Sequence, residues 1–246
     1  GPIYQERSKI INGEREVSEE EFLDKIPSGV TLVEDTAEVK GIPRFWLDVI
    51  LRSEMGDLIQ EHDEEALSYL RDVRSERTIE NDCLKVTIHF DFNPNPFFEN
   101  QTLSKTVTFN SGGDTVLDLS GTPVNWKSGK DLRVGVENKS VRHRVSGQVK
   151  TVQKSVARFT FFLIFDDISL SCCEEGEEHD HDHDHEDEDV KLDAMQIAEI
   201  CSLFDKRLIP EAVEWYTMKA QSDHANMSDL EMDDDESEED ESDYSD

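Results

Sequence analysis

The sequence predicts an α+β domain in which an antiparallel β-sheet packs on helices, followed by a disordered acidic tail. Three observations lead to this fold class. Apolar and polar side chains alternate from Leu84 to Phe92, which indicates a strand with one solvated face. Apolar residues recur at helical spacing both before and after the strand region, which favours an α+β arrangement. Residues 227–246 carry 12 Asp or Glu and no Lys or Arg, so this end has little to bury.

The N-terminal part contains helical patterns separated by breakers. Ser18 and Glu21 have capping-box spacing, which predicts a short helix that ends near Pro27. Pro43 suits the first turn of a longer helix. The apolar residues of that helix recur through residue 58, at Phe45, Trp46, Val49, Ile50 and Leu58.

A second helix is expected to follow directly, with Leu67, Leu70 and Val73 on one side. Asp63 is a good N-cap for it. Glu64 and Glu65 would then lie at the positive end of the helix dipole, where carboxylates are stabilising.

The central region reads as consecutive strands. A second alternating run with Leu103, Val107 and Phe109 is followed by a turn at residues 112–113. Residues 132–154 predict a hairpin whose bend is basic. Residues 156–165, "VARFTFFLIF", predict a further and more fully buried strand.

The last apolar pattern before the tail predicts a closing helix, which ends at Pro210 and is followed by the apolar anchor "EAVEWY". Its expected buried face comprises Met195, Ile197, Ile200, Cys201, Phe204 and Leu208. Three units are therefore expected: the end of an N-terminal helical segment at 1–26, a domain at 27–221 with an acidic, His-rich loop at 174–189, and an acidic tail at 222–246.

The charge of the chain limits its partners. It carries 58 acidic and 25 basic residues, a formal net charge of -33, and 11 of the acidic residues lie in 174–189. Such a polyanion repels DNA and anionic membranes, so no direct binding to either is expected and a protein partner should be cationic. The sequence contains no long apolar run and no secretory signal, which predicts a cytosolic or nuclear protein with reduced cysteines.

No motif predicts catalysis or a cofactor. Gly129 and Lys130 resemble part of a phosphate-binding loop, but Val124 and Asp131 stand where that loop needs a glycine and a hydroxyl residue. His62 beside Asp63 would need further partners from elsewhere in the fold, and capping already explains this spacing.

The run "HDHDHDH", His179 to His185, is a candidate metal site. Imidazole and carboxylate groups are suitable ligands for zinc, copper or nickel. A solvated acidic tract with spacer histidines is the plainer interpretation, because a disordered segment loses chain entropy when it wraps a metal.

Six ordered blocks give the chain a specific resemblance. They are "KGIPRFWLDVI", "QEHDEEALSYLRDV", "NPFFENQTLSKTVTF", "VNWKSGKDL", "GQVKTVQKSVARFTFFLIF" and "RLIPEAVEWY". In order and rough spacing the sequence resembles the nucleosome assembly protein family, which includes the SET (template-activating factor) histone chaperones. The likeness runs from about Ile3 to Tyr216, and the acidic C-terminus matches in character only.

The resemblance implies a non-enzymatic histone chaperone with an earmuff-shaped domain of sheet and helices. Its acidic face and tails would bind core histones, chiefly histone dimers, shield their DNA-binding surfaces and promote nucleosome assembly in nucleus and cytoplasm. The histone-binding residues implied on the domain are Glu61, Asp63, Glu64, Glu65, Glu99, Asp166 and Asp167. In the tail, Asp233, Asp234, Asp235 and Glu236 represent the polyacid that imitates nucleic acid.

Family members form homodimers through a long N-terminal helix, of which only the last turns would be present here, and this leaves a monomer open for this chain. The hairpin with Lys139, Arg142 and Arg144 matches the family's accessory hairpin, whose basic tip serves nuclear import in some members. Two other functions stay open: an acidic regulator of another enzyme, as the SET proteins are of a phosphatase, and metal binding through the His/Asp run.

Overall fold

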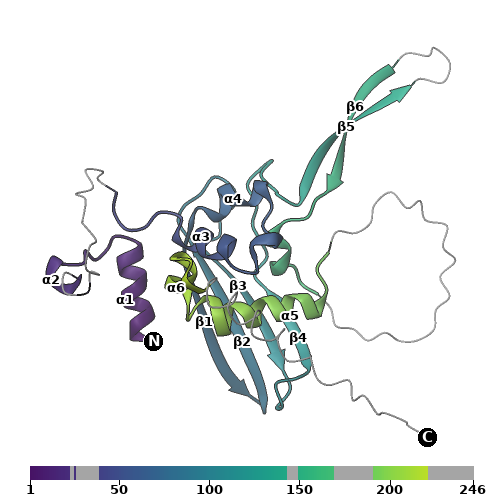
Figure 1. The fold of residues 1–246 in the computed structure, drawn as a ribbon. Helices are drawn as coiled ribbons and strands as arrows, with labels where there is room; N and C mark the ends of the chain where they lie inside the picture. The colour runs from purple at the N-terminus through teal and green to yellow at the C-terminus, as the bar shows by residue number, and fades with distance from the viewer. Residues whose placement is uncertain (23–24, 26–38, 143–148, 169–190, 221–246) are drawn as a thin grey trace, which may run out of the picture.

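A four-stranded antiparallel sheet forms the centre of the molecule. The computed structural model describes residues 1–22, 25, 39–142, 149–168 and 191–220. The strands follow the order β1-β2-β3-β4 and are β1 (Leu70–Glu80), β2 (Cys83–Phe92), β3 (Thr102–Phe109) and β4 (Val116–Gly121). Each strand pairs with the next along the chain, so that the sheet is a meander built from local connections (Figure 1). This agrees with the predicted α+β class.

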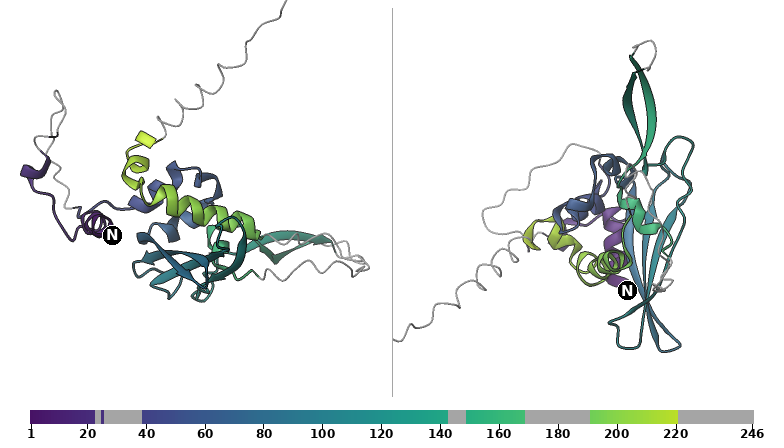
Figure 2. Two further views of the ribbon diagram at one scale, coloured as in Figure 1. Left: turned by 90° about the horizontal axis from the view of Figure 1, so that it is seen from below. Right: turned by 90° about the vertical axis from the view of Figure 1, so that its right-hand side faces the viewer.

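Helices cover one face of this sheet, as Figure 2 shows from two sides. The α-helices are α1 (Pro2–Ile11), α2 (Glu19–Phe22), α3 (Phe45–Arg52), α4 (Glu61–Leu67), α5 (Ala194–Leu203) and α6 (Ala212–Tyr216). Shorter helical segments are η2 (Gly56–Leu58), η3 (Phe161–Phe165) and η4 (Phe204–Leu208). No helix in the described part of the chain is long and apolar enough to cross a bilayer.

The alternation in β2 separates a dry face of the sheet from a wet one. Val86, Ile88, Phe90 and Phe92 are buried beneath the helices. The opposite face carries hydroxyl residues that hydrogen-bond across strands, as the Thr87 and Thr106 hydroxyls do at 2.9 Å. The predicted strand and its solvated face are therefore confirmed.

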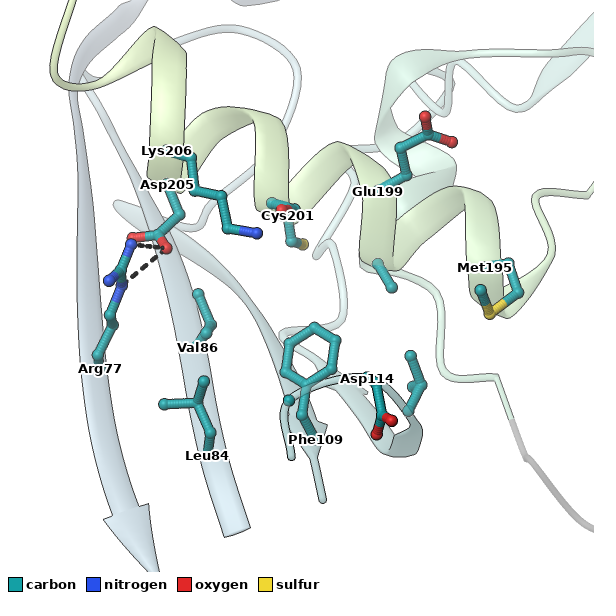
Figure 3. A pocket seen from close by; sticks show the side chains of 14 residues that line it. Arg77, Leu84, Val86, Phe109, Asp114, Met195, Glu199, Cys201, Asp205 and Lys206 are labelled. Atoms are coloured by element: carbon teal, nitrogen blue, oxygen red, sulfur yellow. Dashed lines mark hydrogen bonds and ion pairs between the residues drawn. The ribbon is translucent and has the colours of Figure 1, made fainter. Parts of the chain in front are cut away.

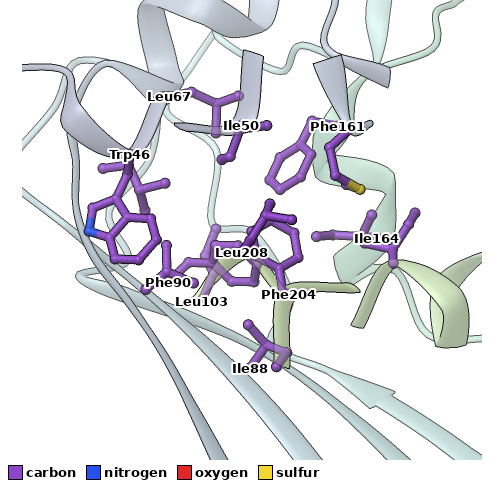
Figure 4. Packing of buried hydrophobic residues seen from close by; sticks show 14 of the residues in the cluster. Trp46, Ile50, Leu67, Ile88, Phe90, Leu103, Phe161, Ile164, Phe204 and Leu208 are labelled. Carbon is purple, nitrogen blue, oxygen red and sulfur yellow. The ribbon is translucent and has the colours of Figure 1, made fainter. Parts of the chain in front are cut away.

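The core is an aromatic cluster centred on Phe90. Its ring meets Phe161, Phe165 and Phe204 edge-on, with ring centroids 5.0 to 5.8 Å apart (Figure 4). Edge-to-face packing is a favoured arrangement of aromatic rings. Sheet, η3 and η4 thus share one core, and Trp46 of α3 is fully buried in the same cluster.

The helix expected over Leu67, Leu70 and Val73 ends at Leu67, and that part of the prediction is wrong. Leu70 and Val73 lie in β1, opposite Phe92 and Phe90. The turn at Asn81 and Asp82, both with positive φ, places Glu80 opposite Cys83 and sets the register of the hairpin. Helical and strand periodicity were not distinguishable over so few apolar positions.

The longer helix predicted from Pro43 is also shorter than expected. Helix α3 ends at Arg52, where the Ser53 hydroxyl donates to the Ile50 carbonyl and accepts from the Met55 amide. Leu58 then belongs to the separate segment η2. A serine that bonds nearby backbone groups offers an alternative to continuing the helix.

Residues 156–165 do not form the predicted strand. Strand β6 (Val149–Ala157) ends early, and η3 is a 3-10 helix whose five residues are all buried. The Thr160 hydroxyl caps it by accepting from the Phe162 amide. A continuous apolar run indicates burial on several sides, which a short helix satisfies as well as a strand.

The remaining elements follow the predictions more closely. The short helix after Ser18 is present as α2, and the Ser18 amide donates to the Glu21 carboxylate. The hairpin is confirmed: β5 (Val134–Arg142) and β6 form a separate two-stranded sheet that projects from the domain (Figure 1). The closing helical face is confirmed in α5 and η4, except that Met195 is exposed.

Candidate acidic binding surface

Helix α4 presents the densest group of the implied binding residues. Gln60 caps the helix and forms a capping box with Asp63, so Gln60 and not Asp63 is the N-cap. Glu61 and Glu65 are exposed, and Glu64 is partly exposed. Glu64 lies 3.3 Å from the guanidinium of Arg44, at a half-exposed position where such a pair is worth about 0 to 1 kcal/mol.

Asp63 does not belong to the surface, which corrects its assignment as a histone contact. Its side chain is fully buried. The carboxylate accepts hydrogen bonds from the Gln60 amide at 3.1 Å, from the Phe161 amide at 2.9 Å and from the Thr160 hydroxyl. A buried carboxylate is retained only where donors satisfy it, and these three donors do so. Asp63 therefore fastens α4 to the start of η3.

His62 provides a second fastening at the same place. Its Nε2 lies 2.9 Å from the carbonyl oxygen of Phe159, an acceptor that requires this nitrogen to carry the proton. His62 and Asp63 thus bind consecutive residues, Phe159 to Phe161, at the start of η3. Among the residues that the structure describes, no group of three or more His, Cys, Asp or Glu side chains is arranged to hold a metal ion.

Asp166 and Asp167 lie at the other end of η3. The Asp166 carboxylate is 3.1 Å from the guanidinium of Arg133. The backbone carbonyl oxygen of Asp166 accepts a hydrogen bond from the buried Lys105 ammonium at 2.7 Å. Burial lowers the pKa of Lys105, because desolvation penalises its charged form. Asp167 accepts from the Gly121 amide at 3.1 Å. The two aspartates are thereby tied to the sheet.

Glu99 reaches the same region through aromatic neighbours. Phe98, the preceding residue, packs on Phe162 of η3 with ring centroids 5.5 Å apart and bridges to Trp126. Glu99 itself is exposed, with Lys127 at 3.8 Å. Helix α4, Asp166 with Asp167, and Glu99 are therefore all anchored around η3, although they come from separate parts of the sequence.

The basic partners Arg44, Lys127 and Arg133 were not anticipated from the sequence. Each lies far along the chain from the carboxylate it approaches, so no short-range spacing indicates the pairs. The tail residues Asp233–Glu236, the run His179 to His185 and Arg144 lie outside the described residues. Lys139 is exposed on the hairpin.

The comparison with protein families decides the identity. The model described as "Nucleosome assembly protein (NAP)" matches residues 1–219, nearly the whole described chain. The chain belongs to the nucleosome assembly protein family. Nucleosome assembly protein 1-like 1 of Xenopus tropicalis is 29% identical over 90% of this chain and 61% of its own length. A probable nucleosome assembly protein of Dictyostelium discoideum is 30% identical over 93% of this chain and 68% of its own length.

A solved structure supports the nucleosome assembly protein fold. Nucleosome Assembly Protein 1 from Plasmodium knowlesi superposes with a TM-score of 0.55 at 23% identity, over 88% of this chain and 78% of that one. The present chain spans about 61% of the Xenopus relative, so the activity of the whole protein is a matter for proposal.

Proposed function

We propose that this member of the nucleosome assembly protein family is a histone chaperone that binds core histones, chiefly as dimers, through the carboxylates around η3 and through its acidic tail. The observation that carries the proposal is the exposed acidic face of α4, with Glu61, Glu64 and Glu65 held on a helix that Asp63 fastens to the core. A fixed set of carboxylates suits a partner whose own charges occupy fixed positions.

The proposed mechanism is the substitution of carboxylates for DNA phosphates. Histone lysines and arginines that face the chaperone are not available for wrong contacts with DNA, and DNA recovers them when it competes successfully. One exposed ion pair contributes about 0 to 1 kcal/mol, so affinity has to come from many pairs acting together. The process needs no enzymatic step, and with a net charge of -33 the chain itself is not expected to bind DNA.

Further parts of the proposal come from family membership. The protein would act in nucleus and cytoplasm and would form a homodimer. The proposed histone-binding carboxylates of the domain are Glu61, Glu64, Glu65, Glu99, Asp166 and Asp167. Those of the tail include Asp233 to Glu236. The boundaries 1–26, 27–221 and 222–246 belong to the same proposal.

The test is a titration of purified histone dimers into the full chain at several salt concentrations. We expect tight binding at low salt that weakens steeply as salt rises, because exposed charges are screened. The double variant Glu64→Lys with Glu65→Lys should weaken binding roughly tenfold or more at physiological salt, which corresponds to at least about 1.4 kcal/mol. Removal of residues 222–246 should weaken binding further.

The matched control is Glu20→Lys with Glu214→Lys, which makes the same charge change at two exposed positions away from α4. If the control weakens binding as much as the α4 variant, only net charge matters and the assignment of α4 is refuted. If the wild-type chain ignores histone dimers at every salt concentration, the chaperone function itself is refuted. Inhibition of a phosphatase by the chain without histones would favour the enzyme-regulator alternative.

A further inference from the structure

A pocket lies between α5 and the far end of the sheet, outside the acidic surface around η3. The strands extend beyond the helices that cover them, so apolar side chains near the strand ends stay partly open to solvent. The pocket has a volume of about 370 Å³ and is shown in Figure 3. Its apolar lining consists of Leu84, Val86, Phe109, Val116, Met195 and Ala198. We call it the α5 pocket.

The apolar lining is unusual for a solvent-facing site. Met195, on the first turn of α5, is 68% exposed beside the pocket, although it is a large apolar side chain. A concave and mostly apolar lining with a few polar groups at its edge is typical of binding sites in soluble proteins. A pocket of this size accommodates a large side chain or a small ligand, for which volumes of about 300 to 1,000 Å³ are typical.

The two ends of the pocket differ in charge. At one end, Arg77 donates from Nε at 2.8 Å and from a terminal nitrogen at 2.6 Å to Asp205, whose side chain is only 4% exposed. This hydrogen bonding raises the pKa of Arg77, so its guanidinium stays charged and is occupied by its partner. Lys206 lies at the same end (Figure 3).

The opposite end is acidic. Figure 3 shows Asp114 on the sheet side of the pocket near Met195, and Glu199 on α5 with its carboxylate turned away from Asp114. Neither carboxylate has an ion-pair partner among the residues that the structure describes. Hydrogen bonds from the side chains of Asn110 and Thr115 lower the pKa of Asp114, which keeps its carboxylate charged. An apolar floor bordered by unpaired carboxylates is complementary to an apolar side chain with a lysine or arginine near it.

We propose that the α5 pocket binds an apolar side chain of a basic protein segment, in which lysines or arginines on either side of that residue meet Asp114 and Glu199 separately. The proposal rests on the proposed function, because the basic partner is the histone cargo, and it deepens that function. Carboxylates alone give affinity that salt removes, whereas a buried apolar anchor adds a contact that salt does not screen. The pocket would thus supply a contact of defined position that loosely held charges cannot provide.

Methyl NMR of the full chain provides a direct test, because the sequence contains five methionines and two exposed ones lie in different places. Met195 borders the pocket, whereas Met218, 54% exposed, lies beyond α6. On addition of histone dimers, the Met195 methyl resonance is expected to shift while the Met218 resonance stays in place. A Met195 resonance that does not respond to saturating histone would overturn the proposal.

A substitution provides the matching affinity test. Ser202 of α5 lines the pocket, so Ser202→Trp should fill it and weaken histone binding roughly tenfold at high salt, where the anchor dominates. Ser120→Trp is the control, since Ser120 is exposed on the wet face of the sheet, opposite Thr106. The conservative pair Asp114→Asn with Glu199→Gln should reduce the salt dependence and tests the site even if Ser202→Trp fails to fold.

The outcomes separate the two proposals. If wild-type chain binds histone dimers but Ser202→Trp and the Asp114/Glu199 pair bind equally well, the pocket proposal is refuted and the chaperone function stands. If wild-type chain binds no histone, the function fails and the proposed occupant of the pocket fails with it.

Discussion

Asp63 is the residue whose carboxylate connects α4 to the core. The carboxylate accepts a hydrogen bond from the Gln60 amide at the start of α4. It accepts another from the hydroxyl of Thr160, which lies 97 residues further along the chain. Glu61 and Glu65 take no part in these hydrogen bonds, but their positions on the surface depend on them. A residue that resembles a binding group in the sequence thus acts by positioning those beside it.

Replacing Asp63 with asparagine should destabilise the domain. The amide group would present N–H donors toward the Gln60 or Phe161 amides, and a buried donor without an acceptor costs about 1 to 3 kcal/mol. Urea unfolding followed by circular dichroism measures the change. Glu65→Gln is the control and should stay within about 0.5 kcal/mol, because Glu65 is exposed. Equal midpoints for Asp63→Asn and wild type would contradict the assigned role.

Cys201 gives the stability a dependence on alkaline pH. Burial raises the pKa of its thiol to about 12, whereas an unfolded cysteine titrates near about 8.5. The unfolded chain therefore releases the proton first. The stabilisation is complete below about pH 8.5 and is lost as pH rises toward the folded value.

Cys201→Ala should remove this dependence. Between about pH 7.5 and about pH 9.5, the free energy of unfolding of wild type is expected to fall by about 1.4 kcal/mol more than that of the variant. Urea titrations at the two pH values measure the difference. Parallel pH profiles for the two proteins would show that the buried thiol is not responsible.

At the scale of elements, η3 organises the candidate surface. The Thr160 hydroxyl and the Phe161 amide at its start donate to Asp63 of α4, its rings fill the core, and its C-terminal end leads into Asp166 and Asp167. Gly121 at the end of β4 lies directly against it. A Cβ atom at Gly121 would be 2.2 Å from the Phe165 carbonyl oxygen, so only glycine permits this approach.

Gly121→Ala should therefore push η3 away from β4 and destabilise the fold by about 1 to 3 kcal/mol, as overpacking does. The displacement should also weaken histone binding, because Asp167 accepts from the Gly121 amide. Gly112→Ala is the control for stability, since a Cβ there meets only the side chains of Asp114 and Asn110 and no backbone atom. Differential scanning calorimetry compares the variants, and an unchanged melting temperature for Gly121→Ala would refute the close approach.

Periodicity predicted β2 and β3 correctly but did not anticipate β1 or β4. In β2, Phe90 and its inward neighbours alternate strictly with polar residues. In β1 only Leu70 and Val73 are buried, and the outer half of the strand is largely exposed, including Arg77, which pairs with Asp205 of η4. An exposed half-strand needs no apolar residues, so no alternating pattern marks it in the sequence.

At the scale of the whole molecule, the hairpin β5–β6 is separate from the rest. It forms its own sheet, and no residue between 134 and 157 belongs to the described hydrophobic core. A two-stranded ribbon without core contacts adds little to the stability of the domain from which it projects. Its basic residues contrast with the acidic remainder of the chain.

Shortening this hairpin should leave the domain folded. Val136 pairs with Ser155, so replacing residues 137–154 with Asn-Gly joins the strands through a two-residue turn. The free energy of unfolding should stay within about 1 kcal/mol of wild type in urea titrations. Ile88→Ala, a fully buried position, should lose about 2 to 5 kcal/mol in the same assay. A comparable loss on shortening would show that the hairpin supports the core.

The sequence by itself determined the α+β class, the strongly acidic character and the family resemblance, because periodicity, charge and ordered motifs are properties of the chain before it folds. Only the tertiary structure decided that Asp63 is buried, that residues 161–165 form a helix, and that the α5 pocket exists. Each of these depends on which segment packs against which across many residues. Burial is set by those contacts and not by the local order of amino acids.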